Sequence, residues 1–335
     1  MRIGIANDLP MAAELLRRLI IRSSSHQVAW IARDGAEAVA WCENDLPELV
    51  LMDLVMPVMD GAEATRRIMS RTPCPILIVT ATLGGNSAKV FEALGAGAID
   101  AVKTPALNSS KIGEQALLLK IERIGRLTSG LGPSATYPTR ETSRTPDKLV
   151  VIGASAGGPG ALVEVFSALP HDFSAAVVVV QHIDEQFAQG LAEWLNERSA
   201  LPVCLAREGD SVSSQKILIA GAGDHLIFKN SRQVGYTTDP VENSYRPSVD
   251  VFFHSAVQSF RGEITAVLLT GMGCDGAQGL KALRDAGHHT IAQDRNTSAV
   301  YGMPKAAAAI NAATEILPLQ KIGSRLNELL VSKSK

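Results

Sequence analysis

The sequence predicts an α/β protein built from two domains, and three observations indicate this fold class. The chain has 335 residues, which is enough for two hydrophobic cores. In both halves, short apolar runs rich in Val, Ile and Leu alternate with amphipathic helical patterns, as in parallel sheets covered by helices. Residues 129–147 are rich in Gly, Pro, Ser and Thr and lack apolar periodicity. We therefore expect domains at 1–128 and 148–335, joined by a flexible linker.

The N-terminal half carries five strand-like segments separated by helical patterns, which predicts a doubly wound, five-stranded parallel sheet. A last helix is expected at 112–128, where Leu117, Ile121 and Ile124 fall on one face. In such sheets the functional side chains collect at the carboxyl ends of the strands. The expected strands are 2–6, 28–32, 49–52, 76–79 and 99–102.

Polar side chains follow three of these strands. Asp8 comes after the first strand, Asp53 after the third and Thr80 after the fourth. Two carboxylates that converge on one crevice repel each other and tend to bind a hard cation such as Mg²⁺. The alternative is that Asp8 is a helix N-cap and Asp53 a turn residue, since both follow strands. Their joint placement favours the cation site.

The segment 51–61 reads L-M-D-L-V-M-P-V-M-D-G and resembles the phosphoacceptor segment of response-regulator receiver domains. The resemblance implies that Asp53 takes a phosphoryl group from a sensor histidine kinase of the CheA type. It also implies that Asp8, Asp53 and the backbone carbonyl of Val55 hold Mg²⁺ for this phosphorylation. Thr80, in I-V-T-A, matches the family's switch hydroxyl.

Two features depart from the receiver pattern. Receivers usually carry two acidic residues after the first strand, whereas this chain has Asn7 and Asp8, which removes one charge from the metal pocket. The family's phosphate-binding lysine directly precedes a proline, but here Thr104 has that place and Lys103 comes one residue earlier. Because side chains alternate along a strand, a one-residue shift reverses the face. We expect weaker Mg²⁺ binding, and a Lys103 that reaches the phosphate only if the loop is remodelled.

The C-terminal half begins with a strand at 149–152 and is expected to continue as a mainly parallel α/β domain. The region 207–250 has a composition typical of strands and turns, which predicts that the sheet ends in antiparallel hairpins. Further strands are expected at 176–180, 203–206, 216–220, 226–228, 264–269 and 290–292, and helices at 161–169, 187–198, 277–286 and 304–313.

An apolar run that ends in a glycine-rich turn opens this half. Residues 149–160 read L-V-V-I-G-A-S-A-G-G-P-G, and Gly153 to Gly157 fits G-x-S-x-G, which places Ser155 on a tight strand-to-helix turn. The helix expected from about Gly158 points its N-terminal N–H groups at the hydroxyl, where they can stabilise an anion. The alternative is a phosphate-binding turn, but the segment lacks G-x-G-x-x-G and no G-K-S/T follows.

Two further strand ends carry reactive side chains. His182 lies just past the apolar run 177–180, and Asp275 follows the strand at 264–269. With Ser155 they provide the side chains of an acyl-transfer triad. Their order, Ser…His…Asp, differs from the Ser…Asp…His of α/β-hydrolases, so that fold is not inferred. The structural alternatives are a hydrogen-bonded histidine and an aspartate that only caps a helix.

Cys274 is a rival nucleophile within the same segment. A reactive thiol needs a lowered pKa, and the carboxylate of the adjacent Asp275 raises it instead. Five further histidines have no strand-end position beside a nucleophile and are interpreted as structural. They are His171, His225, His254, His288 and His289.

Composition argues against several function classes. The formal net charge is −2 and no run of basic residues is present, which disfavours nucleic acid and anionic membrane surfaces. Apolar runs such as 175–180 are too short to span a bilayer, and the N-terminus lacks the apolar core of a signal peptide. The four cysteines are dispersed, which fits reduced thiols and not disulfides or a zinc site. We expect a cytoplasmic protein without nucleic-acid binding or membrane insertion.

Motifs of the C-terminal half resemble those of chemotaxis protein-glutamate methylesterases, the CheB family. They are I-G-A-S-A-G-G (152–158), V-Q-H (180–182), R-P-S-V-D (246–250), L-T-G-M-G-C-D-G-A (269–277) and Y-G-M-P-K-A (301–306). The order of receiver, linker and catalytic half also matches, so the resemblance covers essentially the whole chain. The Asn7-Asp8 pair, A-V-K-T-P and Ala156 in the serine turn are most similar to the WspF-type regulators of Wsp surface-signalling systems.

The resemblance implies hydrolysis of glutamyl methyl esters on methyl-accepting chemoreceptor-type proteins and, as in many members, deamidation of glutamines. It implies that Ser155 attacks the ester, His182 moves the proton and Asp275 orients the imidazole, without a cofactor for catalysis. The Met272 N–H is the candidate oxyanion donor. The unphosphorylated receiver is expected to obstruct the site, and phosphorylation to loosen that contact. A small-molecule serine esterase and a receiver-controlled binding module are the alternatives.

Overall fold

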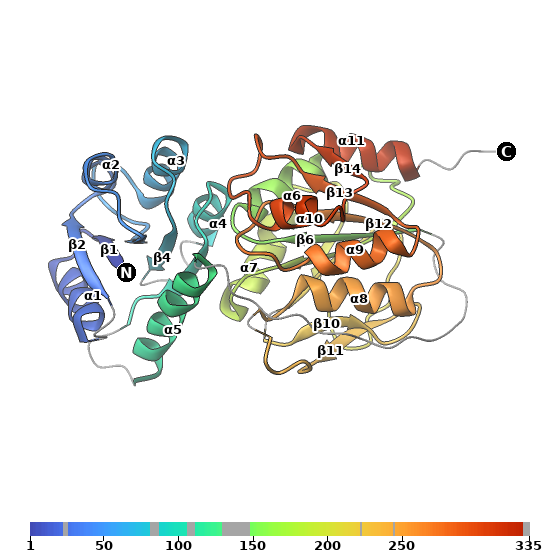
Figure 1. Ribbon diagram of the computed structural model, residues 1–335, viewed down its shortest axis with the longest axis horizontal. Helices are drawn as coiled ribbons and strands as arrows, with labels where there is room; N and C mark the ends of the chain where they lie inside the picture. The colour runs from blue at the N-terminus through green and yellow to red at the C-terminus, as the bar shows by residue number, and fades with distance from the viewer. Residues whose placement is uncertain are drawn as a thin grey trace. The chain divides into compact units, whose positions relative to one another are not determined.

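The computed structural model describes residues 1–22, 26–80, 87–105, 111–128, 148–221, 223–243 and 245–330 (Figure 1). The chain divides into two compact units, Met1–Gly132 and Pro133–Lys335, and each has its own parallel sheet. The linker predicted at 129–147 lies outside the described residues. Within the described ranges, no helix is long and apolar enough to cross a membrane.

The first unit contains a five-stranded parallel sheet in the order β2-β1-β3-β4-β5. The doubly wound α/β fold predicted from the sequence is confirmed, and each predicted strand is present within one residue of its expected ends. The strands are β1 (Arg2–Ala6), β2 (Gln27–Ala32), β3 (Leu49–Met52), β4 (Ile76–Thr80) and β5 (Asp100–Lys103), and the helices are α1 (Pro10–Arg22), α2 (Gly35–Asn44), α3 (Gly61–Arg71), α4 (Ser87–Gly95) and α5 (Lys111–Thr128).

Helices cover both faces of this sheet (Figure 1). α1 and α5 share one hydrophobic core with the strands, to which Leu16, Ile20, Leu117 and Ile121 contribute buried side chains. On the other face α2 packs on α3, and α3 packs on α4. Burying each large aliphatic side chain contributes about 1.5–3 kcal/mol. The packed helices hold the carboxyl ends of β1, β3 and β4 at one edge, where Asp53 lies.

The second unit contains a seven-stranded parallel sheet in the order β14-β13-β12-β6-β7-β9-β8 and a separate antiparallel hairpin. The sheet strands are β6 (Lys148–Ala154), β7 (Ala176–Gln181), β8 (Val203–Leu205), β9 (Ile217–Ile219), β12 (Glu263–Leu268), β13 (His289–Gln293) and β14 (Glu315–Leu317). The hairpin strands are β10 (His225–Phe228) and β11 (Val234–Thr237), and the helices are α6 (Gly158–Ser167), α7 (Glu185–Asn196), α8 (Val249–Ser259), α9 (Ala277–Asp285), α10 (Met303–Ala309) and α11 (Leu319–Leu330).

Some elements of this unit differ from the sequence expectation. The hairpin of β10 and β11 forms its own two-stranded sheet and does not extend the large one. The sequence does not predict α8, because buried residues such as Phe252 and Phe253 surround much of the helix and hide its amphipathic period. It also misses β14 and α11, since β14 has only three residues and is too short for a strand pattern.

The centre of the large sheet brings the predicted reactive side chains to one edge. β6 pairs with β12 on one side and with β7 on the other. The register aligns Gly153 with Leu268 and with Val180, so the three strands end at a similar level. Since parallel strands present their carboxyl ends at the same edge, Ser155, His182 and the loop after β12 leave the sheet together.

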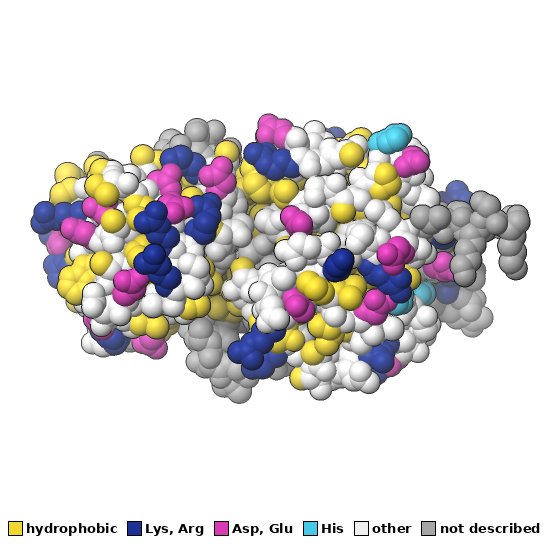
Figure 2. Space-filling view, turned by 90° about the horizontal axis from the view of Figure 1, so that it is seen from above, with side chains coloured by type: hydrophobic (Ala, Val, Ile, Leu, Met, Phe, Trp, Pro, Cys, Tyr) yellow, Lys and Arg dark blue, Asp and Glu magenta, His cyan; other side chains and the backbone are white. Residues whose placement is uncertain are grey.

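Charged side chains of both signs are mixed on the face shown in Figure 2. Among the described residues in that view, lysine and arginine side chains lie beside aspartate and glutamate side chains on both units. Several ion pairs join neighbouring turns of one helix, for example Glu14 with Arg17 and Glu63 with Arg67. Exposed pairs of this kind contribute about 0.2–1 kcal/mol each, so the cores, and not the surface charges, stabilise the two units.

Candidate active site

Ser155 lies on the tight turn that joins β6 to α6. Gly157, the N-cap of α6, has a φ of +76°, a left-handed conformation that glycine adopts without strain. A Cβ added at Gly158 would meet the side-chain oxygen of Gln181, so only glycine allows the turn to pack this closely. The N–H of Ser155 donates to the Thr270 carbonyl at 3.0 Å, which ties the turn to the loop after β12.

The side chain of Gln181, the last residue of β7, connects this serine turn to His182. Its Nε2 donates to the carbonyl of Ser155 and to the carbonyl of His182, both at 2.9 Å. Gln181 is 2% exposed, so both bonds are shielded from water and electrostatically strong. One amide therefore fixes the candidate nucleophile relative to the candidate base on the neighbouring strand.

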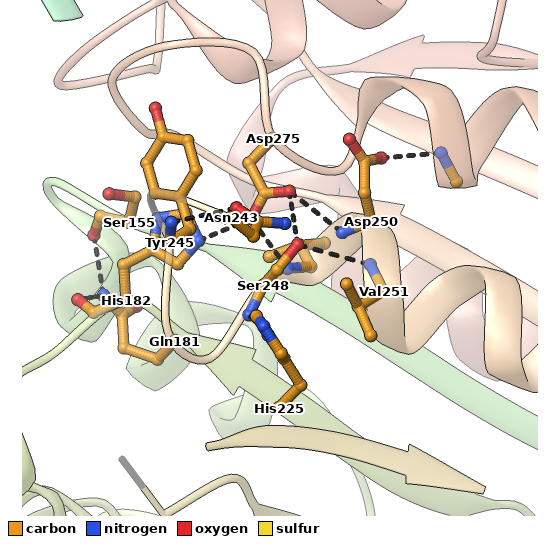
Figure 3. Close-up of polar contacts among 12 residues, drawn as sticks. Ser155, Gln181, His182, His225, Asn243, Tyr245, Ser248, Asp250, Val251 and Asp275 are labelled. Atoms are coloured by element: carbon orange, nitrogen blue, oxygen red, sulfur yellow. Dashed lines mark hydrogen bonds and ion pairs between the residues drawn. The ribbon is translucent and has the colours of Figure 1, made fainter. Parts of the chain in front are cut away.

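His182 and Asp275 form a buried hydrogen-bonded pair. Nε2 of His182 lies 2.8 Å from Oδ2 of Asp275, and their side chains are 10% and 3% exposed. Because an ionised carboxylate only accepts hydrogen bonds, Nε2 carries the proton and Nδ1 is left as an acceptor. Nδ1 is buried and has no hydrogen-bond partner among the described residues. Figure 3 shows Ser155 and Asp275 on either side of the imidazole ring.

Asp275 is held as an anion at the N-terminus of α8. Its Oδ1 accepts from the Ser248 hydroxyl at 2.8 Å and from the Asp250 N–H at 3.1 Å. Its Oδ2 also accepts from the Val249 N–H at 2.7 Å, and a helix N-terminus favours negative charge. Burial by itself raises the pKa of Asp275, but the His182 hydrogen bond and the backbone N–H groups outweigh it and hold the pKa below its ordinary value.

Asp250, in α8, caps the N-terminus of α9, just as Asp275, which precedes α9, caps α8. It lies in the first turn of α8, and its Oδ1 accepts from the N–H of Gly279 in α9 at 2.6 Å. The N-cap of α9 is Gly276, which has no side chain to cap the helix. The two helices therefore exchange carboxylate caps, because Asp275 precedes α9 and caps α8. Burial and the neighbouring Asp275 charge raise the pKa of Asp250 to about 8.

In the first unit, Asp53 lies just after the carboxyl end of β3, next to Asn7 after β1. Nδ2 of Asn7 donates to Oδ2 of Asp53 at 2.9 Å, and the N–H of Leu54 donates to Oδ1 at 2.7 Å. Burial raises the pKa of Asp53 to about 6. The Asp8 charge adds to that rise, while the N–H groups of Leu54 and Val55 and the Asn7 amide oppose it.

Thr80 and Lys103 lie side by side at the ends of β4 and β5. Thr80 is buried, and its carbonyl accepts from the N–H of Thr104 at 2.9 Å. The register pairs Lys103 with Thr80, and Lys103 is exposed. Among the described residues, Lys103 makes no hydrogen bond or ion pair with Asp53, so no lysine neutralises that carboxylate there.

Few oxygen atoms near Asp53 are available to bind a hard cation. The candidate oxygen donors are the carboxylates of Asp8 and Asp53 and the carbonyl of Val55, since the Asn7 side-chain oxygen already accepts from the Leu9 N–H at 2.9 Å. In the described part of the chain, no group of three or more His, Cys, Asp or Glu side chains could hold a metal ion. Mg²⁺ commonly uses one or two carboxylates and keeps several waters, so this donor set suits it.

Comparisons with known proteins match both halves of the chain. A family model described as CheB methylesterase matches residues 150–326, and one described as response regulator receiver domain matches residues 3–112. A protein-glutamate methylesterase/protein-glutamine glutaminase of Mesorhizobium japonicum is 57% identical over 98% of each chain. This chain belongs to the CheB methylesterase family. A second relative of the same description, from Cupriavidus metallidurans, is 56% identical over 97% of each chain.

A solved structure is also similar to the second unit of this CheB-family chain. The crystal structure of the Thermotoga maritima CheB methylesterase catalytic domain is 37% identical, with a TM-score of 0.52, and covers 54% of this chain and 98% of that chain. The family, the α/β fold with a receiver and the hydrolase class predicted from the sequence are confirmed. The domain limits, the roles of the site residues and the WspF-type sub-assignment stay predictions.

The loop after β12 lies against Ser155 in this CheB-family site. A Cβ added at Gly271 would come within 2.7 Å of the Cβ of Ser155. The Gly271 N–H already donates to the Val300 carbonyl at 3.0 Å. The next N–H along, that of Met272, makes no hydrogen bond within the described residues and is therefore available to an oxyanion near the serine.

Cys274 is an exposed, free thiol in the same loop. Neighbouring residues still remove part of the water around the thiol, and this desolvation, together with the carboxylates of Asp250 and Asp275, raises its pKa. Since the thiolate is the nucleophilic form, the raised pKa makes this cysteine a poor nucleophile at neutral pH. The geometry therefore favours Ser155.

Sequence reasoning misses the residues that surround the acid and the base. Ser248 is the N-cap of α8, and a serine before an apolar run is a recognisable helix start. His225, interpreted as structural, is fully buried; its Nδ1 accepts from the Ser248 N–H at 3.1 Å and its Nε2 lies 3.3 Å from the Pro240 carbonyl. Tyr245 stacks on the ring of His182. No local pattern indicates that His225 or Tyr245 reaches the site.

Proposed function

We propose that this chain is a phosphorylation-controlled protein-glutamate methylesterase that acts on a methyl-accepting chemoreceptor-type protein. The observation that carries the proposal is the buried His182–Asp275 pair, whose unpartnered Nδ1 lies beside the turn that bears Ser155. This is the arrangement that acyl transfer by a serine requires. The glutamyl substrate class is supported by the names of the relatives, which match nearly the full length of the chain.

In the acylation step, Oγ of Ser155 attacks the carbonyl carbon of the glutamyl methyl ester. Nδ1 of His182 takes the hydroxyl proton, and a tetrahedral oxyanion forms. The oxyanion then collapses, the bond between the carbonyl carbon and the methoxy oxygen breaks, and the imidazolium returns the proton so that methanol leaves. The hydroxyl is not bonded to Nδ1 in the described structure, and catalytic hydrogen bonds of this kind often tighten only when substrate binds.

In the deacylation step, His182 takes a proton from water and the resulting hydroxide attacks the acyl-serine carbonyl. Collapse of the second tetrahedral anion breaks the bond to Oγ, and the imidazolium protonates Ser155. The free glutamate is released with a new negative charge on the receptor. The same steps applied to a glutamine side chain release ammonia in place of methanol, and the relatives' printed names support this second activity.

Two groups stabilise the charges that develop during these steps. Asp275 keeps its negative charge at the N-terminus of α8 and holds the imidazole by Nε2, so it favours the imidazolium without taking the proton. The Met272 N–H is the proposed oxyanion donor. Neither step needs a metal ion or an organic cofactor.

We assign Asp53 as the phosphoacceptor for a sensor histidine kinase of the CheA type. Asp8, Asp53 and the Val55 carbonyl would hold Mg²⁺, which neutralises the charge of an incoming phosphoryl group when bound. Thr80 would donate its hydroxyl to that group, and Lys103 would join it only if the loop after β5 is remodelled.

We further propose a cytoplasmic protein with a receiver at 1–128, a flexible linker at 129–147 and a methylesterase domain at 148–335. The matched ranges 3–112 and 150–326 support these limits. Phosphorylation of one domain would then control hydrolysis in the other by changing how they associate.

Methanol release from membranes that carry a methylated receptor tests the activity. Wild type is expected to release methanol, and Ser155→Ala to reduce the rate at least about 10³-fold. The matched control is Ser174→Ala. Ser174 lies near the amino end of β7 and, within the described residues, its hydroxyl bonds only the Leu330 carbonyl of α11, so the substitution should leave the rate unchanged. Methanol release that survives in Ser155→Ala contradicts the assignment of Ser155 as the nucleophile. If wild type releases no methanol, the binding-module alternative is favoured.

Activation by acetyl phosphate tests the control by the receiver. The rate of methanol release is expected to rise several-fold with wild type and to stay at its basal value with Asp53→Ala. Faster turnover of simple alkyl esters than of the receptor, with no response to acetyl phosphate, would favour a small-molecule esterase. An equal response by Asp53→Ala contradicts the assignment of the phosphoacceptor.

A further inference from the structure

A tyrosine ring lies flat on the imidazole of His182. The ring centroids of Tyr245 and His182 are 4.6 Å apart, and the ring planes are inclined by 15° (Figure 3). Tyr245 comes from the loop that leads into α8, whereas His182 follows β7. Neither the acylation nor the deacylation step described above uses this tyrosine, so its contact with the base needs a separate explanation.

The contacts of His182 leave the plane of its ring open to rotation. Only Nε2 has a hydrogen-bond partner, Asp275, while Nδ1 has none among the described residues. The χ2 torsion of a histidine has a broad minimum, so one in-plane hydrogen bond restrains one atom of the ring and not its tilt. A flat contact on the ring face restrains the tilt, and Tyr245 supplies that contact at 4.6 Å.

The loop that carries Tyr245 is itself held by specific hydrogen bonds. The N–H of Tyr245 donates to Oδ1 of Asn243 at 2.9 Å. Nη2 of Arg246 donates to the carbonyls of Thr238 and Val241, at 2.9 and 3.0 Å. These bonds close the loop on itself, so the tyrosine is presented to the imidazole by an anchored backbone.

We propose that Tyr245 is a positioning residue for the general base. Its ring face keeps the imidazole in the plane that directs Nε2 to Asp275 and leaves Nδ1 to the serine. The ring face is also the negative end of the aromatic quadrupole, so it favours the imidazolium that forms during acylation. This inference rests on the proposed roles of Ser155 and His182.

Other charged groups around the base act through different contacts. Asp275 bonds Nε2 in the plane of the ring, and Asp250 bonds the amide of Gly279 in α9. The guanidinium of Arg246 bonds backbone carbonyls, and its Nη1 lies 3.5 Å from Asp224. Among the residues drawn in Figure 3, the tyrosine is therefore the one that supplies the face contact.

The test compares Tyr245→Phe with Tyr245→Leu in the full-length protein. Phenylalanine keeps the ring face, and leucine keeps apolar volume but has no face. The matched control is Phe260→Leu, which removes a buried aromatic ring at the far end of α8, about 16 Å along the helix from its N-terminus. Thermal melting reports how much each substitution destabilises the fold.

Two readouts separate positioning from packing. The first is kcat and KM for methanol release, with the pH profile of kcat/KM. The second is independent of activity: the low-field proton NMR signal of the Nε2–H that bonds Asp275, with the ¹⁵N shifts that report which ring nitrogen carries the proton. Tyr245→Leu is expected to lower kcat about tenfold, the size of a buried cation–π contact, with KM within about twofold. It should also broaden or abolish the low-field signal.

Tyr245→Phe is expected to retain kcat within about twofold and the low-field signal, and Phe260→Leu to lower the melting temperature without changing either readout. A Tyr245→Leu variant with wild-type kcat and an intact signal would overturn the proposal. Equal losses in the phenylalanine variant would do the same, because the ring face would then not be the cause. If wild type hydrolyses no methyl ester but the signal follows the tyrosine as described, the proposed function fails and the positioning contact stands.

Discussion

Asp275 and Asp53 are two aspartates that follow interior strands of parallel sheets. The groups around them shift the carboxyl pKa in opposite directions. Asp275 receives hydrogen bonds from a helix N-terminus, a serine hydroxyl and an imidazole, and its pKa lies below the ordinary value. Asp53 is also largely shielded from water, but burial raises its pKa to about 6 and the neighbouring Asp8 adds to the rise. The same place in the topology thus holds one stabilised charge and one poorly neutralised charge.

The difference fits the roles proposed for the two carboxylates. An aspartate that only orients a base keeps its charge through the whole cycle, so fixed donors stabilise it permanently. An aspartate that is to accept a phosphoryl group must leave its oxygens accessible to a cation and to the phosphorus atom. Donors that filled every acceptor position of those oxygens would compete with both. Asp53 has fewer donors than Asp275, namely the Leu54 and Val55 N–H groups and the Asn7 amide, so acceptor positions stay free. The partner set of a strand-end aspartate, and not its position in the sheet, therefore distinguishes the two roles.

The largest expected effect comes from Asp275→Asn. The amide cannot hold the imidazole in the required tautomer, so kcat for methanol release should fall about 10⁴-fold. Phosphorylation of Asp53 by acetyl phosphate should be unchanged, because Asp53 belongs to a unit with its own core. Methanol release and phosphoprotein formation are measured on the same preparation. A loss of less than about tenfold would show that the Asp275 charge is not needed.

Ser248→Ala removes one donor from Asp275 and the N-cap of α8 at once. We expect kcat to fall about tenfold and the free energy of unfolding to fall by about 1 kcal/mol, as is usual for the loss of an N-cap and of a hydrogen bond to a charge. Ser167→Ala is the control, since that hydroxyl bonds the Glu164 carbonyl and no other group in the described part of the chain. Kinetics and urea unfolding measure the two quantities, and unchanged kcat would argue against donor control of Asp275.

Asn7→Asp should make the cation site around Asp53 more negatively charged. The substitution removes the amide that donates to Asp53 and adds a carboxylate, so affinity for Mg²⁺ should rise by about tenfold, or ~1.4 kcal/mol. Without the ion, the added repulsion should lower stability. Titration calorimetry with Mg²⁺ measures the affinity, and Asn44→Asp on the exposed part of α2 controls for net charge. An unchanged affinity would mean that Asn7 is not next to the ion.

The smallest effect concerns the pH dependence of stability at Asp250. Its pKa is raised to about 8 from the ordinary 3.8, so the folded state keeps a proton that the unfolded chain releases. This contribution to stability is present below about pH 4 and is lost as the pH rises towards 8. Asp250→Asn should therefore lose less stability than wild type between pH 6 and 7, by about 3–5 °C in Tm. If Tm changes with pH in the same way in the two proteins, the raised pKa of Asp250 is contradicted.

The strands and the reactive strand ends could be predicted because they depend on local patterns. β3, β6 and β7 are buried on both faces and read as continuous apolar runs. Ser155 and His182 directly follow such runs, and a parallel sheet brings their ends to one edge. The glycine-rich turn is also local, since Gly157 and its positive φ follow the serine by two residues.

The contacts that tune the site could not be predicted, because they join segments far apart in the chain. Ser248 reaches Asp275 across 27 positions, and His182 reaches it across 93. The loop that carries Tyr245 has no period that reveals its direction. The direction of the imidazole, with Nε2 on the acid and Nδ1 towards the nucleophile, also depends on this tertiary packing and has no signature in V-Q-H.

The exchange of caps between α8 and α9 links the chemistry of this protein to the order in which it folds. Contacts across long stretches of chain form late, since the loops between them must be ordered first. Until both helices have docked, one of the two carboxylates is buried without its donors, which is costly. The serine turn is local and can form early, whereas the acid–base pair is complete only with the finished tertiary structure. During refolding, recovery of hydrolysis should therefore coincide with the last cooperative folding phase.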